Sequence, residues 1–237
     1  MNKPKIIYDV LVRLEPYAKN PKNHQPYECL KIALGIEDNK ESNILKLRTK
    51  LANTVYEIAD TFEADNPDFS DRTWTNDLVK FLTIPTHDAN AFFSHLQKIY
   101  PYTKNMIALQ MRSWELIKGQ SKILDQSDLQ TIKQNTNELI EKLISNEDLD
   151  PQARAFSIKQ LKKILEIVDY YKIYGNEGII EIIEESIGHT FINKNYQDFM
   201  RSEKSESWRK YLTDLSVIVA TSDSVLSIST TLKNLLP

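Results

Sequence analysis

A row of glutamates in the second half of the chain is the arrangement of residues whose spacing best fits a chemical role. The row consists of Glu177, Glu181, Glu184 and Glu185. Their steps of i, i+4, i+7 and i+8 place them on one side of a helix, opposite a set of isoleucines. Such carboxylates could bind a basic partner, or could coordinate a cation together with ligands from other helices. These four glutamates are the candidate partner-binding residues of the chain.

The simpler interpretation of this row, and the one that the spacing favours, is a solvated helix face. Lysines on the preceding helix could then neutralise part of it, and the candidates are Lys159, Lys162 and Lys163.

Residues 175–178 have the sequence GNEG, and a G-x-x-G turn between helices can clamp a nucleic-acid backbone in K-homology-type domains. That use needs basic or neutral residues facing phosphate and a nearby sheet, whereas Glu177 is acidic and no strong strand pattern flanks it. We therefore predict a helix connector, in which Gly175 takes the left-handed conformation after a long helix. Asn176 is expected to cap the next helix and Gly188 to close it. Walker A and Rossmann sequences are also absent, and no nucleic-acid partner is expected.

Histidine and cysteine give little support for metal binding or nucleophilic catalysis. His87 and His95 share a predicted helix, but Ala91 occupies the i+4 position at which a metal-binding helix usually places its second ligand. Cys29 is the only cysteine, so the chain cannot form an internal disulfide, and a reducing compartment such as the cytoplasm is expected. We expect its thiol to be buried on a short helix. The sequence therefore predicts no catalytic, cofactor-binding or metal-binding residue.

Composition indicates that helices position these side chains. Only 5 of the 237 residues are glycine, about 2% against roughly 7% in average proteins. Few glycines mean few tight turns and few positive φ angles, which disfavours sandwiches, barrels and glycine-rich nucleotide loops. The hydrophobic fraction of 41% is enough for a core, and a net charge of −3 lacks the basic excess typical of nucleic-acid or anionic-membrane binding.

Apolar residues recur at helical spacing along most of the chain. Between Ile44 and Phe62 they step by three and four, which predicts a helix of about 20 residues with Arg48 off the apolar stripe. Asp150 followed by Pro151 is the clearest helix start, and the dense apolar positions beyond it predict a central helix contacted on at least two sides.

The predicted fold class is therefore all-α: a multi-helix bundle or an array of antiparallel helical hairpins, with a central helix near 151–174. The segment GQSKILDQ is the best candidate boundary. It divides the chain into an N-terminal helical part, 1–119, and a C-terminal helical part, 120–237, unless the two form one continuous domain.

Local signals predict several helix ends. The first helix is expected to end near Pro16, and a short helix to begin near Pro26 and end at Gly35. Thr86 is expected to cap a further helix, and Ser127 to open a capping box.

The C-terminal segment 208–237 is poor in charge and rich in Ser, Thr and Val. Its apolar residues fit one helical face, but Asp214 and Asp223 interrupt any stretch of membrane length. We expect a packed helix here, with an oligomer interface or a membrane-active element as alternatives. Asp9 and Arg13 break the apolar run near the N-terminus, so no signal peptide is expected.

Residues 150–189 contain the runs DPQAR and LKKILEIVDYYKIYGNEGIIEIIEESIGH. This segment resembles part of a group of uncharacterised all-helical bacterial proteins from mobile or conflict-associated gene neighbourhoods. The resemblance implies a mobile or conflict-associated gene context, but it implies no activity and no site residue.

Three functions remain open from the sequence. The first is a non-enzymatic, cytoplasmic helical component that binds another protein, as an immunity or accessory protein of a bacterial conflict or defence system does. The second is a membrane-acting effector that uses residues 208–237. The third is an enzyme with a site of dispersed carboxylates. Self-association into a homo-oligomer is compatible with the first of these functions, the protein-binding component.

Overall fold

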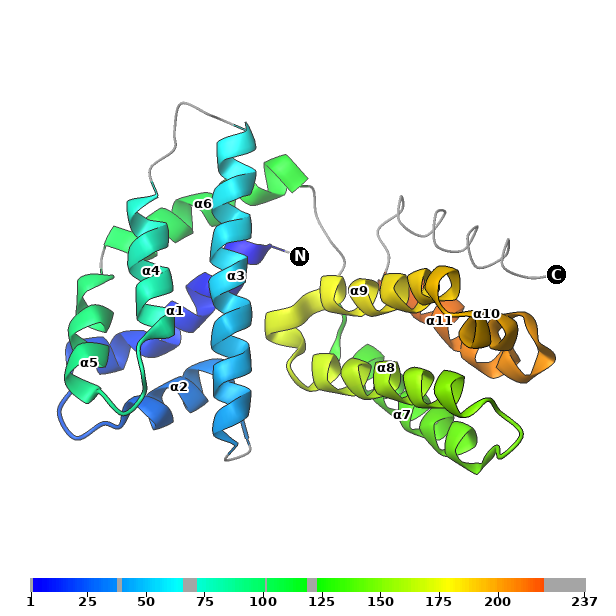
Figure 1. Ribbon diagram of the computed structural model, residues 1–237. Helices are drawn as coiled ribbons and strands as arrows, with labels where there is room; N and C mark the ends of the chain where they lie inside the picture. The colour runs from blue at the N-terminus through cyan, green and yellow to red at the C-terminus, as the bar shows by residue number, and fades with distance from the viewer. Residues whose placement is uncertain (1, 38–39, 66–71, 101, 119–122, 220–237) are drawn as a thin grey trace. The chain divides into compact units, whose positions relative to one another are not determined.

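The computed structural model describes residues 2–37, 40–65, 72–100, 102–118 and 123–219, and within these ranges every regular element is a helix (Figure 1). The all-α prediction is thereby confirmed. The chain divides into two compact units, an N-terminal unit of residues 2–120 and a C-terminal unit of residues 121–237. Each unit has helices packed around its own core.

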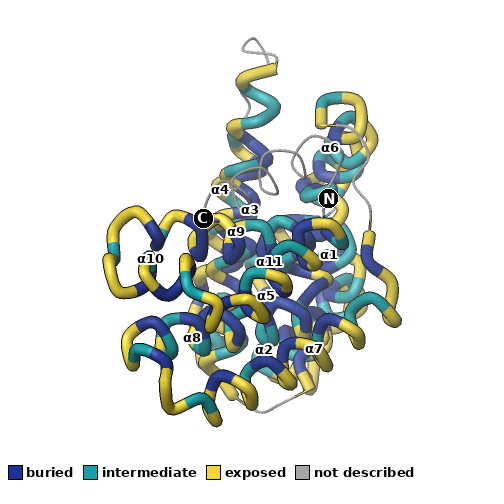
Figure 2. The backbone as a smooth tube through the Cα atoms, turned by 90° about the vertical axis from the view of Figure 1, so that its right-hand side faces the viewer, coloured by how far each residue is buried: buried dark blue, intermediate teal, exposed yellow. Residues whose placement is uncertain are grey.

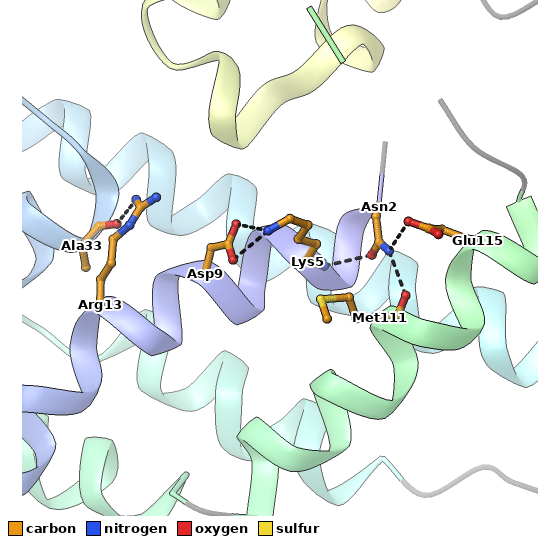
Figure 3. Close-up of polar contacts among 7 residues, drawn as sticks. All are labelled: Asn2, Lys5, Asp9, Arg13, Ala33, Met111 and Glu115. Atoms are coloured by element: carbon orange, nitrogen blue, oxygen red, sulfur yellow. Dashed lines mark hydrogen bonds and ion pairs between the residues drawn. The ribbon is translucent and has the colours of Figure 1, made fainter. Parts of the chain in front are cut away.

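The described helices of the N-terminal unit are α1 (Lys3–Lys19), α2 (Pro26–Leu34), α3 (Glu41–Asp65), α4 (Thr73–Thr83), α5 (Ala89–Lys98) and α6 (Tyr102–Lys118). Helix α1 packs against α2, α3, α5 and α6, and α4 packs against α3, α5 and α6. Side chains bind α1 to its neighbours: Asn2 Nδ2 donates to Met111 O at 2.8 Å, and Arg13 Nη1 donates to Ala33 O at 2.9 Å (Figure 3).

The apolar stripe of α3 is buried as its spacing predicts, from Ile44 to Ile58, with Phe62 half-buried. Arg48, expected off this stripe, is instead buried. Its guanidinium donates to Ile84 O and, at 3.4 Å, to Phe81 O. These carbonyls lie at the C-terminal end of α4, where helical partners run out and a cation is favourable.

One helix end of the N-terminal unit differs from the expectation and one agrees with it. Helix α1 continues through Pro16 to Lys19. Proline has no N–H, so Pro16 cannot donate to the carbonyl of Val12 as a helical residue normally would. Pro16 and Val12 are both exposed, so that carbonyl is on the side of α1 that water reaches. Helix α2 does end at Gly35, whose φ of 70° is left-handed, and Ile36 N donates back to Lys31 O at 3.0 Å.

The described helices of the C-terminal unit are α7 (Gln126–Ser145), α8 (Pro151–Asp169), α9 (Tyr171–Ile192), α10 (Lys194–Arg201), the 3₁₀ helix η2 (Glu203–Ser205) and α11 (Glu206–Val219). Contacts between α7 and α8, α8 and α9, α9 and α11, and α11 and α7 close a four-helix ring. Helix α8 also contacts α10, which confirms that the helix beginning at Pro151 is contacted on at least two sides. Buried positions recur every three or four residues along these helices (Figure 2).

Two predicted caps are replaced by nearby aspartates. Asp125, not Ser127, begins α7, and it forms a reciprocal capping box with Asp128. Asp88, not Thr86, caps α5 by accepting a hydrogen bond from Ala91 N at 2.9 Å. In both cases a side-chain oxygen caps the helix as expected, but it comes from a residue two positions away from the expected one.

The break after α8 also differs from the expectation. The helix that begins at Pro151 ends at Asp169, not near residue 174, and Tyr170 separates it from α9. Gly175 lies inside α9 with φ 61° and ψ −167°, a conformation essentially confined to glycine, and it kinks the helix. Helix α9 then continues past Gly188 to Ile192, so Gly188 does not close it.

Within the C-terminal segment 208–237, residues 208–219 belong to α11. They bury Trp208, Tyr211, Leu212, Leu215 and Val219 in the core of the unit. Residues 220–237 lie outside the described part of the chain, and the helix expected there lies outside it as well.

Candidate protein-binding face

Helix α9 has one buried and one exposed side beyond its kink. The buried side carries Ile179, Ile182, Ile183 and Ile187, which belong to the core of the C-terminal unit. The exposed side, called here the outer face of α9, consists of Glu181, Glu184, Glu185, Gly188, Phe191 and Ile192. At 100° per residue these six positions lie within about 120° of one another around the helix axis.

Three of the four predicted glutamates belong to this outer face. Glu181, Glu184 and Glu185 are exposed, whereas Glu177 is half-buried at the edge of the face, near the kink. The structure therefore places the acidic row on the surface of a well-packed helix, as its spacing implied.

One glutamate of the row is engaged by the preceding helix. Lys163 Nζ lies 2.6 Å from Glu185 Oε2, an ion pair between α8 and α9. Burial acts to raise the pKa of Glu185, but the Lys163 hydrogen bond and the charges of Lys163 and Lys159 outweigh it, so the pKa is lowered. The Gln160 amide also acts to lower this pKa, although it lies outside hydrogen-bond geometry. Because both ionic side chains are more than a third exposed, the pair contributes at most about 1 kcal/mol.

Two large apolar side chains complete the outer face at its C-terminal end. Phe191 is 69% exposed and Ile192 is 81% exposed. They follow Gly188 at i+3 and i+4, and Gly188 follows Glu184 at i+4, so the acidic and apolar parts form one continuous surface. The sequence interpretation missed both residues because it ended the helix at Gly188.

The two glycines of α9 beyond the kink have different surroundings. A Cβ atom at Gly178 would lie 3.0 Å from Tyr174 Cβ on α9 and 3.3 Å from Ile167 Cγ2 on α8, so these two close neighbours explain this glycine. At Gly188 a Cβ atom would meet nothing within 4 Å. An exposed glycine in a helix interior costs about 1 kcal/mol relative to alanine. No contact within the described fold accounts for that cost at Gly188.

The GNEG segment, expected to connect two separate helices, forms the kink inside α9 and makes buried polar contacts. Gly175 and Asn176 are both buried. Asn176 Nδ2 donates to Val219 O at 3.0 Å, and Asn176 Oδ1 accepts from Tyr171 Oη at 2.5 Å. The Asn176 side chain therefore binds the beginning of α9 to the end of α11.

His95 and His189 contact neighbouring residues and Cys29 is buried, whereas His87 is exposed and precedes α5, so it does not share a helix with His95 as expected. His95 Nδ1 lies 3.0 Å from Ala91 O, and the ring of His189 stacks on Phe156 with centroids 3.8 Å apart. Cys29 is buried, and burial raises the pKa of its thiol to about 11. In the described ranges, no group of three or more His, Cys, Asp or Glu side chains could hold a metal ion.

Comparison with known proteins found no matching family model, curated protein or solved structure. Among the described residues, no helix has both the length and the apolar character needed to cross a bilayer. The class defined by the fold is an all-α protein of two helical units, and such a fold does not by itself imply a function.

Proposed function

We propose that this protein is a non-enzymatic, cytoplasmic binding component that recognises another protein through its C-terminal unit. The outer face of α9 carries this proposal. It is a continuous exposed surface on which acidic residues adjoin Phe191 and Ile192. Exposed aromatic and aliphatic side chains beside charged groups are typical of protein–protein contact surfaces.

The resemblance of residues 150–189 to conflict-associated bacterial proteins supplies the context for this proposal. An immunity or accessory protein acts by binding a toxin, nuclease or sensor of the same system, and stoichiometric binding needs no catalytic group. The outer face of α9 lies at the C-terminal end of the segment that carries the resemblance.

The test is purification of the tagged full-length chain from its native host, followed by reconstitution from pure components. We expect one co-purifying protein at stoichiometric amount, and a complex of the two that survives size-exclusion chromatography with light scattering. Recovery of the chain alone, over a range of salt concentrations and growth conditions, would contradict the proposal.

A further inference from the structure

We infer that the outer face of α9 binds an amphipathic helix of the partner, basic at one end and apolar at the other. This inference rests on the proposed function and specifies its ligand. The order of groups along α9 carries it: Glu181, Glu184 and Glu185 come first, Gly188 follows, and Phe191 and Ile192 come last.

The dimensions of the face suit a short helix. Eleven residues separate Glu181 from Ile192, which is about 16 Å at 1.5 Å per residue. A partner segment of about three turns spans that length, with its anchors spaced like the i, i+3, i+4 and i+7 positions of helix-in-groove complexes. Lysine or arginine at one end then faces the carboxylates, and leucine or aromatic side chains at the other cover Phe191 and Ile192.

Gly188 independently indicates close approach at the centre of the face. No contact among the described residues requires glycine there, in contrast to Gly178, whose missing Cβ makes room for Tyr174 and Ile167. Glycine exposes the helix backbone and lets another backbone or a bulky side chain pack directly on it. A partner side chain lying over Gly188 would touch Glu184 on one side and Phe191 on the other.

The charges favour a protein over a membrane as the bound surface. An anionic lipid surface would be repelled by Glu181 and Glu184, both exposed next to the apolar residues. A cationic peptide gains from the same carboxylates, chiefly in its association rate and partner choice. Lys163 already neutralises part of the charge of Glu185.

The direct test uses two designed peptides with the full-length protein. One is a Leu/Lys helix of about three turns whose binding face carries lysines at one end and leucines at the other, and the second has glutamate in place of every lysine. Fluorescence anisotropy should detect binding of the Leu/Lys peptide that weakens with added salt, and no binding of the Leu/Glu peptide. Equal binding of both peptides, or of neither, would overturn the inference.

Matched charge variants then separate this face from general attraction. Glu181→Lys with Glu184→Lys should weaken Leu/Lys binding about tenfold or more. Glu138→Lys with Glu141→Lys makes the same change of net charge at exposed positions with the same spacing on α7, and should leave binding within about twofold. Equal losses in the two double variants would place the binding elsewhere.

Apolar variants test the other end of the face. Phe191→Ser should weaken binding about tenfold, whereas Ile144→Ser, at another well exposed apolar position, on α7, should not. Gly188→Ala should weaken binding without unfolding α9, which circular dichroism would verify. If Gly188→Ala and Phe191→Ser both bind like the unaltered protein, the inference fails.

The reconstituted complex distinguishes failure of this inference from failure of the proposed function. A stable complex that is insensitive to all of the α9 variants would retain the proposed function and reject this face. Absence of any complex would reject the proposed function, while the peptide measurements would still decide whether the face binds basic helices.

Discussion

Tyr171 and Asn176 share a hydrogen bond, from Oη to Oδ1 at 2.5 Å, although they stand five residues apart on α9. In a regular helix, residues five apart point about 140° away from each other. The conformation of Gly175, between them, brings the two side chains together. Tyr171 Oη also accepts from Leu124 N at 3.0 Å, so one phenol joins the beginning of α7 to the kink of α9.

Removing that phenol hydroxyl should destabilise the C-terminal unit. Tyr171→Phe leaves Leu124 N and Asn176 Oδ1 without this partner in a buried site, and we expect a loss of about 1–3 kcal/mol. Hydrogen exchange should show faster exchange of amides in α7 and α9, with the N-terminal unit unchanged. Tyr56→Phe, at a partly exposed tyrosine in α3, should have no such effect. A native exchange pattern in Tyr171→Phe would contradict this account.

Gly178 and Gly188, the two glycines of α9 beyond its kink, should respond in opposite directions to substitution by alanine. Gly188→Ala should stabilise the C-terminal unit by about 0.4–1 kcal/mol, because alanine favours helix and meets no neighbour. Gly178→Ala should destabilise it by about 1–3 kcal/mol, because the new methyl group overlaps Tyr174 and Ile167. Thermal unfolding of the two variants measures both changes. A destabilised Gly188→Ala would show that the fold itself requires this glycine.

The buried guanidinium of Arg48 should be required for the C-terminal end of α4. Arg48→Met removes the donors to Phe81 O and Ile84 O, and we expect a loss of about 1–3 kcal/mol. Burial lowers the pKa of Arg48, so part of this loss is offset by no longer burying a charge. Urea denaturation measures the net effect. Unchanged stability would mean that the two contributions cancel.

The thiol of Cys29 should be unreactive in the native protein. Burial raises its pKa to about 11, so the thiolate is scarce at pH 8 and the sulfur is also covered. With Ellman's reagent we expect no rapid reaction in buffer and one thiol per chain in guanidinium chloride, since the chain has one cysteine. Rapid labelling under native conditions would show that α2 opens readily.

The C-terminal unit should lose stability at alkaline pH. Burial raises the pKa of Tyr196 and of Tyr211, although hydrogen bonds with Trp208 and Thr136 respectively lower it in part. A phenol whose folded pKa is raised contributes full stability below its unfolded pKa, roughly 10. That stability is lost as pH rises above this value, because the unfolded chain ionises first. Absorbance at 295 nm should show that the tyrosines ionising last do so together with unfolding. Tyr211→Phe should make the alkaline loss smaller.

Much of the architecture can be read from apolar spacing, whereas several details depend on contacts between distant residues. The stripe of α3 and the start at Pro151 are local signals and are confirmed. The burial of Arg48 depends on carbonyls more than 30 positions away in the chain, which no local pattern contains. The end of α8 at Asp169 carries no capping residue or proline that could have marked it.

The candidate face was found in part from its glutamates, and its apolar end was missed. A glycine after an apolar run is a common helix end, and Gly188 was interpreted in that way. The positions of Phe191 and Ile192 at i+3 and i+4 from Gly188 were the available signal for a longer helix. Spacing alone cannot decide between these interpretations. A glycine can have the same position relative to the preceding apolar residues whether the helix ends there or continues past it.

The placement of the three tryptophans has a consequence for optical experiments. Trp74 and Trp114 lie in the N-terminal unit, while Trp208 lies in the C-terminal unit and donates from Nε1 to Tyr196 Oη at 2.8 Å. With phenylalanine in place of the first two, the tryptophan emission of the chain would come from Trp208 alone. The red shift on denaturation would then follow one half of the molecule without any attached dye.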